Sequence, residues 1–228
     1  MNIAFLSDIF YKLLSGVPLT LNLTIVSLVG GGILALILNS MRSSLVGNAI
    51  ASTYVFLFRG TPLLIQIFVI YYGLSAIPFI RHSFLWTFLR EPYWCGLLAL
   101  ILNDAAYTSE ILRGAFRAVP PGSYEAAKVV GMTPWGTFRR VSFPIALRQA
   151  MPAYSNEVVA MLKGTALVST ITLMEVTGIA SAAVRETWRA IEIFLCAAVI
   201  YLMLSLLVTW LFAYVEGRLS PWLFREAR

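Results

Sequence analysis

The stretch LTLNLTIVSLVGGGILALIL, residues 19–38, contains no charged side chain and is long enough to decide the class of this protein. A helix of about 20 mostly apolar residues spans the hydrocarbon core of a bilayer, which is roughly 30 Å thick. The rest of the chain agrees: of 228 residues, 59% are hydrophobic and 12% are charged, and this charged fraction is about half that of a soluble domain. The sequence therefore predicts an integral membrane protein.

Four further apolar runs follow the first one. They cover residues 54–77, 93–112, 150–173 and 193–214. Because a segment in lipid has to satisfy its own backbone hydrogen bonds, each run is predicted to be a helix. We therefore expect an all-α integral membrane protein, a bundle of five transmembrane helices that forms one domain over residues 1–228. The glycines at 30–32 would let a neighbouring helix approach closely or would let the first helix kink.

Residues 1–16 precede the first span and show a second kind of pattern. Their apolar residues recur at helical spacing: Phe5, Leu6, Ile9, Phe10, Leu13 and Leu14. Such a face is typical of a helix that lies on the membrane surface, although the segment could equally be the front end of the first span. We expect no signal peptide here, because a basic leader and a cleavage site with short side chains are missing.

The basic residues predict the orientation of the five spans, because lysine and arginine concentrate in cytoplasmic segments. With the N-terminus outside, eleven basic residues fall in inner segments: Arg42, Arg59, Arg113, Arg117, Lys128, Arg139, Arg140, Arg148, Arg218, Arg225 and Arg228. Five fall in outer segments: Lys12, Arg81, Arg90, Arg185 and Arg189. We therefore predict that the N-terminus is outside and the C-terminus is cytoplasmic. The net charge of +6 reflects this topology and does not indicate nucleic-acid binding.

Residues 120–144, PPGSYEAAKVVGMTPWGTFRRVSFP, interrupt the apolar chain and would be cytoplasmic. Pro120 and Pro121 end any helix that precedes them, and Ser123 is a suitable N-cap for a new helix. Glu125 is then expected in the first turn, where its charge suits the helix dipole. The short helix is expected to end near Gly131.

Small side chains line one face of this predicted helix. Ala126 and Val130 are four residues apart, and so are Ala127 and Gly131. Such a stripe could pack into a groove on a partner protein. Alternatively, the helix could lie on the lipid surface with its basic residues against anionic head groups. The residues alone leave both alternatives open.

The segment also resembles a known motif. Glu125-Ala126-Ala127, three residues, Gly131, nine residues and the ending VSFP (141–144) are similar to the "EAA" motif of bacterial ABC importer permeases, which usually ends in Ile-x-Leu-Pro. In that family the motif forms the coupling helix, which inserts into a cleft on the ATP-hydrolysing subunit. The resemblance implies an ATPase-coupling role for Glu125, Ala126, Ala127, Gly131 and Pro144.

Three more segments narrow the resemblance. FRGTPLLIQ (58–66), NDAAYTSEILRG (103–114) and MPAYSNEVVAMLKGTAL (151–167) are similar to permeases of polar amino acid uptake systems, above all the M-type subunits of histidine, basic amino acid and opine systems. The resemblance implies a type I importer fold in a bacterial inner membrane and a polar, basic substrate such as histidine, arginine, lysine, ornithine or an opine. It also implies partners: two ATP-binding cassette subunits, a second homologous permease in a heterodimer, and a periplasmic amino acid-binding protein.

Energy for such transport is predicted to come from another polypeptide. The chain has no G-x-x-x-x-G-K-[ST] phosphate loop, so ATP would be bound by the partner, and we expect no cofactor or metal in this chain. The sequence contains no recognisable nucleophile–base pair, so the subunit is predicted not to be an enzyme. An ion-coupled secondary carrier is the alternative, since the fourth span is polar and interrupted by glycine. A membrane subunit with a purely structural role is a second, weaker alternative.

Polar residues inside the spans are the candidate substrate path. Asn103 and Asp104 lie in the third predicted span, and Asn156 and Glu157 lie in the fourth. A charge at bilayer depth costs about 2.5–3.5 kcal/mol on insertion scales, so each needs a compensating role. The carboxylates could face a cationic substrate. Alternatively, Asp104 or Glu157 could pair with Lys163 or an arginine and only brace the bundle.

Overall fold

The computed structural model describes residues 3–219, and every regular element among them is helical. The long helices are α1 (Ile3–Leu14), α2 (Val17–Met41), α3 (Leu45–Gly60), α8 (Pro92–Arg117), α11 (Phe143–Gly164), α12 (Val176–Thr187) and α13 (Ala190–Leu219). The short ones are α4 (Leu63–Phe68), α5 (Leu74–Ala76), α6 (Pro78–Arg81), α7 (Trp86–Leu89), α9 (Pro121–Val129) and α10 (Pro134–Thr137). Two π-helical turns, η1 (Val69–Gly73) and η2 (Phe138–Ser142), and a 3₁₀ segment, η3 (Thr165–Ile171), complete the set. The all-α prediction is confirmed for these residues.

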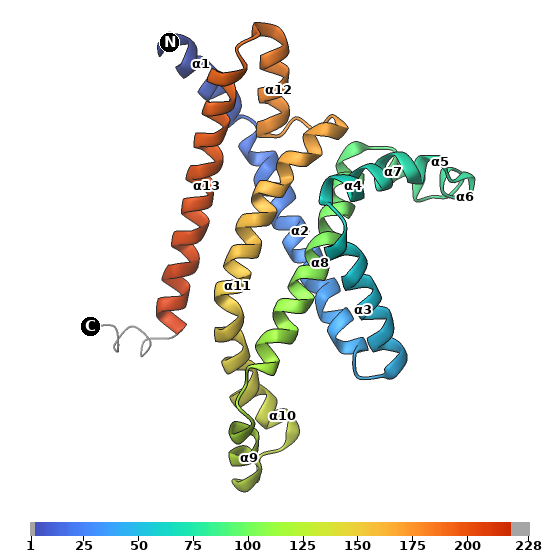
Figure 1. Cartoon of the computed structure of the whole chain (residues 1–228), viewed down its shortest axis with the longest axis vertical. Helices are drawn as coiled ribbons and strands as arrows, with labels where there is room; N and C mark the ends of the chain where they lie inside the picture. Colours follow the sequence, from blue (N-terminus) through green and yellow to red (C-terminus); the bar gives the residue numbers. More distant parts are fainter. Residues whose placement is uncertain (1–2, 220–228) are drawn as a thin grey trace.

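The helices form an elongated bundle around α8 (Figure 1). α2 and α11 make the most extensive contacts with α8, α3 also packs on α8, and α13 packs on α11. α1 and α12 lie at one end of the bundle, and α9 and α10 project from the opposite end. α8 therefore connects the middle of the bundle to the polar segment that the sequence singled out.

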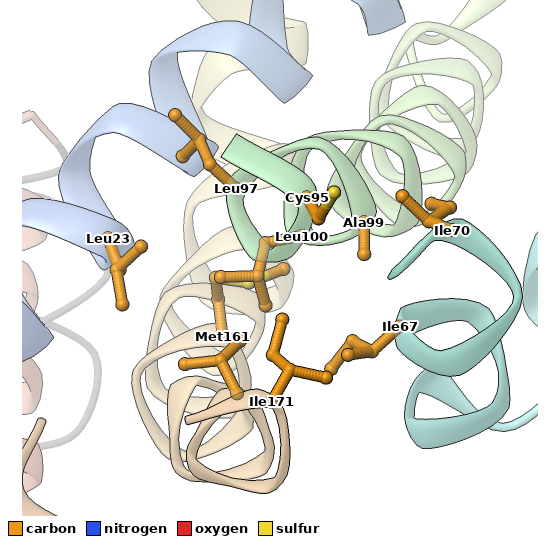
Figure 2. Close-up of a cluster of buried hydrophobic side chains, with 10 residues drawn as sticks. Leu23, Ile67, Ile70, Cys95, Leu97, Ala99, Leu100, Met161 and Ile171 are labelled. Atoms are coloured by element: carbon orange, nitrogen blue, oxygen red, sulfur yellow. The ribbon is translucent and has the colours of Figure 1, made fainter. Parts of the chain in front are cut away.

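An apolar core joins four parts of the chain around α8 (Figure 2). Leu23 of α2, Ile67 of α4, Leu100 of α8 and Ile171 of η3 are fully buried in it, and Met161 of α11 is nearly so. Lipid tails are as apolar as these side chains, so exclusion of water contributes little to their association. Close packing and dispersion contacts hold the helices together instead.

α2 and α8 approach each other closely at two of the three glycines. A Cβ atom on Gly30 would lie 2.9 Å from Ile101 Cδ1, and a Cβ atom on Gly31 would overlap the side chain of Asp104. Gly32 faces open space. α2 runs through all three glycines as one helix, so the prediction of close helix approach is confirmed and the kink is not observed.

Among residues 3–219, three helical stretches are long and apolar enough to cross a membrane: Ala4–Met41, Pro92–Arg117 and Ala190–Arg218. They contain the predicted spans 19–38, 93–112 and 193–214. Two bent helix pairs raise the number to five if each pair makes one crossing. The fourth predicted span, 150–173, lies mainly in α11 and η3, and α12 follows at an angle of 46°. Arg225 and Arg228, which contribute to the orientation prediction, lie outside the described residues.

The second predicted span, 54–77, is not one helix, and this expectation was wrong. The chain bends by 105° between α3 and the helical stretch Leu63–Ala76. Pro62 has no amide hydrogen and disfavours helical geometry in the residue before it, and Thr61 is indeed extended, with φ −117° and ψ 145°. Residues 54–60 therefore end α3, and a new helix starts at Leu63.

The start of α9 also differs from the prediction. The helix begins at Pro121 with Pro120 as its N-cap, so Ser123 is inside the helix and Glu125 lies beyond the first turn. Proline is well suited to the first helical position, because its φ is already helical and the missing amide hydrogen would have no partner there. The predicted end is correct: the last helical residue is Val129, and Gly131 follows in the left-handed region with φ +72°.

α1 packs against the bundle through the face that the sequence indicated. Ile9 and Leu13 are buried in a second apolar cluster with Val176 of α12 and Ile193 of α13. Ala4–Met41 also qualifies as a single apolar stretch. These contacts favour the front end of the first span over an isolated surface helix.

We expect Gly31→Ala to destabilise the protein by about 1–3 kcal/mol, because overpacking a close helix contact forces side chains or backbone to move. Gly32→Ala is the matched control, since the added methyl group meets open space. Thermal unfolding of both purified variants in detergent measures the difference. Equal midpoints for the two variants would contradict the close α2–α8 contact.

Candidate functional site

The bend between α3 and α4 is held by one side chain, that of Gln66. This residue is 7% exposed, and its Nε2 donates toward the carbonyl oxygens of Phe58 (2.8 Å) and Thr61 (3.1 Å) and the hydroxyl of Thr61 (2.9 Å). The last carbonyls of a helix have no partner within it, so they need a donor from elsewhere. Gln66 supplies that donor inside the apolar part of the molecule.

Asn103 of α8 holds Gln66 in place. Its Nδ2 donates to Gln66 Oε1 over 3.0 Å, and both side chains are buried. One turn before Phe58 in α3, the Tyr54 hydroxyl donates to the carbonyl oxygen of Leu102, the residue before Asn103, over 2.7 Å. α3, α4 and α8 are therefore joined by polar contacts where the chain bends.

Asp104 is fully buried beside these contacts. Thr108 Oγ1 donates to its Oδ1 over 3.3 Å, and Oδ2 has no hydrogen-bond partner among the described residues. An unpaired oxygen on a buried carboxylate is rare and is typical of functional sites in membrane proteins.

A cavity of about 520 Å³ opens next to these residues. Its polar lining comes from Arg59 of α3, Thr61 at the bend, Asn103 and Tyr107 of α8, and Glu157 of α11. The Arg59 guanidinium lies over the Tyr107 ring, 5.1 Å from its centre, and both Arg59 and Glu157 line the cavity. The cavity thus offers a cation, a carboxylate, an amide and an aromatic ring to a small polar molecule.

The four predicted path residues are not all in one place. Asn103 and Glu157 line the cavity, whereas Asp104, the residue after Asn103, is fully buried and does not line it. Asn156 is exposed on α11 and does not line the cavity. Lys163 is also exposed and forms no ion pair among the described residues, so it does not neutralise Asp104 or Glu157.

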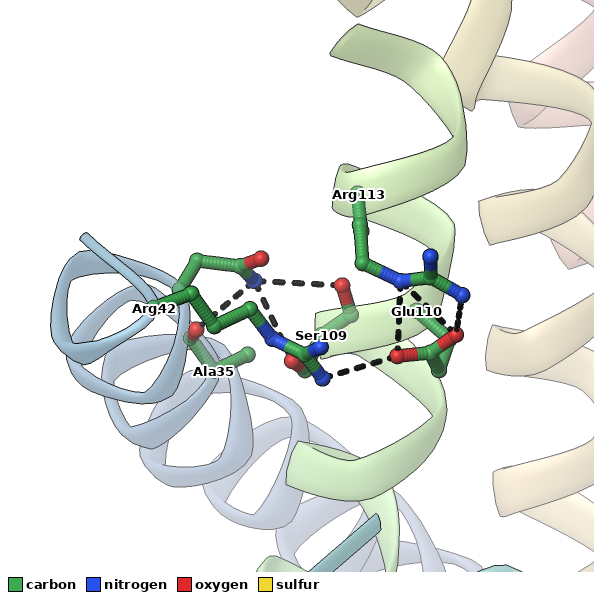
Figure 3. Close-up of polar contacts among 6 residues, drawn as sticks. Ala35, Arg42, Ser109, Glu110 and Arg113 are labelled. Carbon is green, nitrogen blue, oxygen red and sulfur yellow. Dashed lines mark hydrogen bonds and ion pairs between the residues drawn. The ribbon is translucent and has the colours of Figure 1, made fainter. Parts of the chain in front are cut away.

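A second polar cluster lies nearer the end of α8 (Figure 3). Glu110 accepts a hydrogen bond from Arg42, at the end of α2, over 2.8 Å, and it pairs in a two-pronged manner with Arg113. Asn39 of α2 donates to the carbonyl oxygens of Ala35 (3.0 Å) and Ser109 (3.1 Å). These contacts fix the ends of α2 and α8 to each other.

Residues 120–144, the predicted coupling segment, project beyond that cluster (Figure 1). Ala127 is buried, 3% exposed, whereas Glu125, Ala126 and Gly131 are exposed. Val129 is also exposed, at 86%. The small residues of the predicted stripe are therefore divided: Ala127 faces the protein, and the others form an outer face.

Pro144 lies at the other end of the coupling segment, near the start of α11, and is half-buried. The preceding turn, η2, is π-helical. Proline removes a helical hydrogen bond and its ring crowds the carbonyl four residues earlier, and a wider turn relieves that crowding. Pro144 therefore shapes the junction between the coupling segment and α11.

Comparisons with known proteins give the family and the fold of this chain. Residues 27–221 match the family described as "Binding-protein-dependent transport system inner membrane component". The chain belongs to this family. It is 52% identical to the octopine transport system permease protein OccM of Rhizobium radiobacter, over 96% of this chain and 90% of that protein. It is 40% identical to the histidine/lysine/arginine/ornithine transport system permease protein HisM of Escherichia coli K12, over 90% and 87% of the two chains.

A solved structure supports the same assignment. The crystal structure of an amino acid ABC transporter with histidines contains a chain that is 34% identical and superposes with a TM-score of 0.82. The match covers 96% of this chain and all of that chain. The protein is therefore a permease subunit of an amino acid or opine ABC importer with the type I fold, a translocation component and not an enzyme.

Replacing Gln66 with leucine should destabilise the protein by about 2 kcal/mol or more, because buried groups that lose a partner cost roughly 1–3 kcal/mol each. Phe58, Thr61 and Asn103 would all lose a contact. Gln149→Leu, on an exposed position of α11, is the control. The thermal midpoints of both variants are the measurement, and a Gln66→Leu protein as stable as the control would refute the role of Gln66.

Proposed function

We propose that this chain is a transmembrane permease subunit for basic amino acids or opines, driven by ATP that a separate subunit binds and hydrolyses. The observation that carries the ATPase coupling is the outer face of α9 and the residues that follow it, which presents Ala126, Val129 and Gly131 beyond the ends of the long helices. A protein surface rarely exposes clustered apolar side chains without a partner. The resemblance to the EAA motif supports an ATP-binding cassette subunit as that partner.

The names of the relatives support the substrate class. OccM is named for octopine, and HisM is named for histidine, lysine, arginine and ornithine. The cavity beside the α3–α4 bend has the groups that such a molecule needs. Glu157, with Asp104 behind it, would attract a cationic side chain, and Arg59 would attract the carboxylate of an amino acid.

The proposed assembly contains five polypeptides: two ATP-binding cassette subunits, this chain, a second homologous permease as the other half of a heterodimer, and a periplasmic binding protein that delivers the substrate. The family description, an inner membrane component that depends on a binding protein, supports this arrangement. We place the single permease domain, residues 1–228, in the bacterial inner membrane. Five crossings would leave the N-terminus outside and the C-terminus and α9 in the cytoplasm. ATP would be bound only by the partner, and this chain would need no cofactor or metal.

The path through the chain would use Asn103, Asp104 and Glu157 directly. Asn156, on the exposed side of α11, would face the second permease subunit, so that both subunits border one path. Glu125, Ala126, Gly131 and the buried Ala127 would dock or support the coupling helix. Pro144 would transmit its movement to α11 through the junction at η2.

Gly131→Val should reduce ATP-dependent uptake by at least about tenfold while the protein still inserts and folds. The branched side chain would block the docking face. Because residue 131 has a left-handed backbone, valine there would also add about 1–2 kcal/mol of local strain. Uptake into proteoliposomes that contain the whole assembly, and the ATPase activity of that assembly, are the measurements. Gly217→Val on α13 is the control, because its added atoms meet open space and its φ is not positive. Normal uptake by Gly131→Val would refute the docking role.

Glu157→Gln should reduce uptake of arginine by about tenfold or more, equivalent to about 1.4 kcal/mol, and change uptake of glutamine much less. The reason is the loss of the carboxylate that faces the cationic side chain. The ratio of kcat/KM for the two substrates is the measurement. Glu186→Gln is the control, since Glu186 is 63% exposed and pairs only with the exposed Lys12. An equal loss for arginine and glutamine would favour a structural role for Glu157.

A further inference from the structure

A second cavity, of about 820 Å³, lies where the coupling segment folds against the ends of α2 and α8. Four of its lining residues are basic: Arg42, Arg113, Arg117 and Lys128. Neither the transport path nor the outer face of α9 uses this cavity. It lies on the inner side of the coupling segment, between α9 and the rest of the protein.

The charges around this cavity are only partly balanced. Glu110 pairs with Arg42 and Arg113, whereas Arg117 and Lys128 have no acidic partner among residues 3–219. Four cations and one carboxylate leave three positive charges around one hollow. Arg42 Nε is buried and has no hydrogen-bond partner among the same residues. A buried donor without a partner is costly, and an acceptor in the cavity would remove that cost.

The basic residues converge because of their spacing. Arg113 and Arg117 are four apart on α8, and Tyr124 and Lys128 are four apart on α9, so each pair lies on one face of its helix. All four residues line the same cavity. Thr137 of α10 adds a hydroxyl group. Guanidinium, ammonium and hydroxyl donors around one hollow match the oxygens of a phosphate group.

We propose that this cavity binds a phosphate group, and that its source is the head group of an anionic phospholipid. Two stretches long enough to cross the membrane, Ala4–Met41 and Pro92–Arg117, end at the cavity, which puts it at the depth of lipid head groups. Basic pockets at the cytoplasmic ends of transmembrane helices are known to bind such head groups. The phosphate would join Lys128 of α9 to Arg117 of α8 and so brace the coupling segment. The cytoplasmic placement and this bracing role rest on the proposed function, whereas the phosphate site itself depends only on this chain.

The test uses the purified whole assembly in a neutral detergent. Binding of dihexanoyl phosphatidylglycerol, dihexanoyl phosphatidylcholine and inorganic phosphate is titrated separately by thermophoresis. The site variant is Arg117→Gln/Lys128→Gln, which leaves the Arg42–Glu110–Arg113 contacts intact. The control is Arg139→Gln/Arg140→Gln, which removes the same charge from exposed residues of the same segment that do not line the cavity.

We expect phosphatidylglycerol to bind the wild type and the control equally well and to bind the site variant at least tenfold more weakly. Phosphatidylcholine should bind none of the three proteins. Inorganic phosphate binding as tightly as phosphatidylglycerol, with the same loss in the site variant, would keep the phosphate site but overturn its lipid source. Equal phosphatidylglycerol affinity in both variants would overturn the proposal. So would loss of the ATPase subunit from the site variant without loss of lipid binding, because the cavity would then hold an acidic group of that partner. Normal transport by the Gly131→Val assembly would refute the docking hypothesis. Phosphatidylglycerol binding by that same assembly would show that the phosphate site stands without it.

Discussion

Gln66 makes the hydrogen bonds that the backbone cannot make where the chain bends at Thr61 and Pro62. Broken helices occur inside a membrane only where protein or water satisfies the freed backbone groups. The contact between Gln66 and Asn103 ties this repair to α8, the central helix. The bend also turns Arg59 toward Tyr107 and Glu157. One polar side chain therefore explains both why the chain can bend here and why a polar cavity lies at the bend.

α8 carries the rest of the polar chemistry at successive depths. Asn103 and Asp104 are in its middle, Glu110 and Arg113 bind the end of α2, and Arg117 is its last residue before the turn into α9. Gly31 lets α2 lie directly against Asp104, so the two helices have little freedom to slide. Under the proposed function, a movement of α9 would therefore reach the path residues through one stiff helix and would not need a chain of loops.

The sequence could predict that long helices exist, because an uncharged stretch such as residues 19–38 has no alternative in lipid. It could not predict which way the polar residues point. Gln66 is the clearest case: its importance depends on Asn103, 37 residues later in the chain. The sole hint was an amide in an apolar run four residues after Pro62. Asn156 and Glu157 are neighbours that the pattern treats alike, yet only Glu157 reaches the cavity. The rotation of α11 decides this, and that rotation comes from tertiary packing.

Apolar side chains are exposed in two settings that have different meanings. On α13, exposed residues such as Leu202, Leu206 and Trp210 belong to a stretch that can cross the membrane, so lipid or a neighbouring permease can cover them. Val129 and Trp135 are even more exposed, but they lie on the segment that projects past the end of α8 (Figure 1). Hydrocarbon does not extend beyond the ends of the helices that cross it, so lipid tails cannot cover α9 and α10. A partner protein could cover them, as the proposed docking of α9 requires.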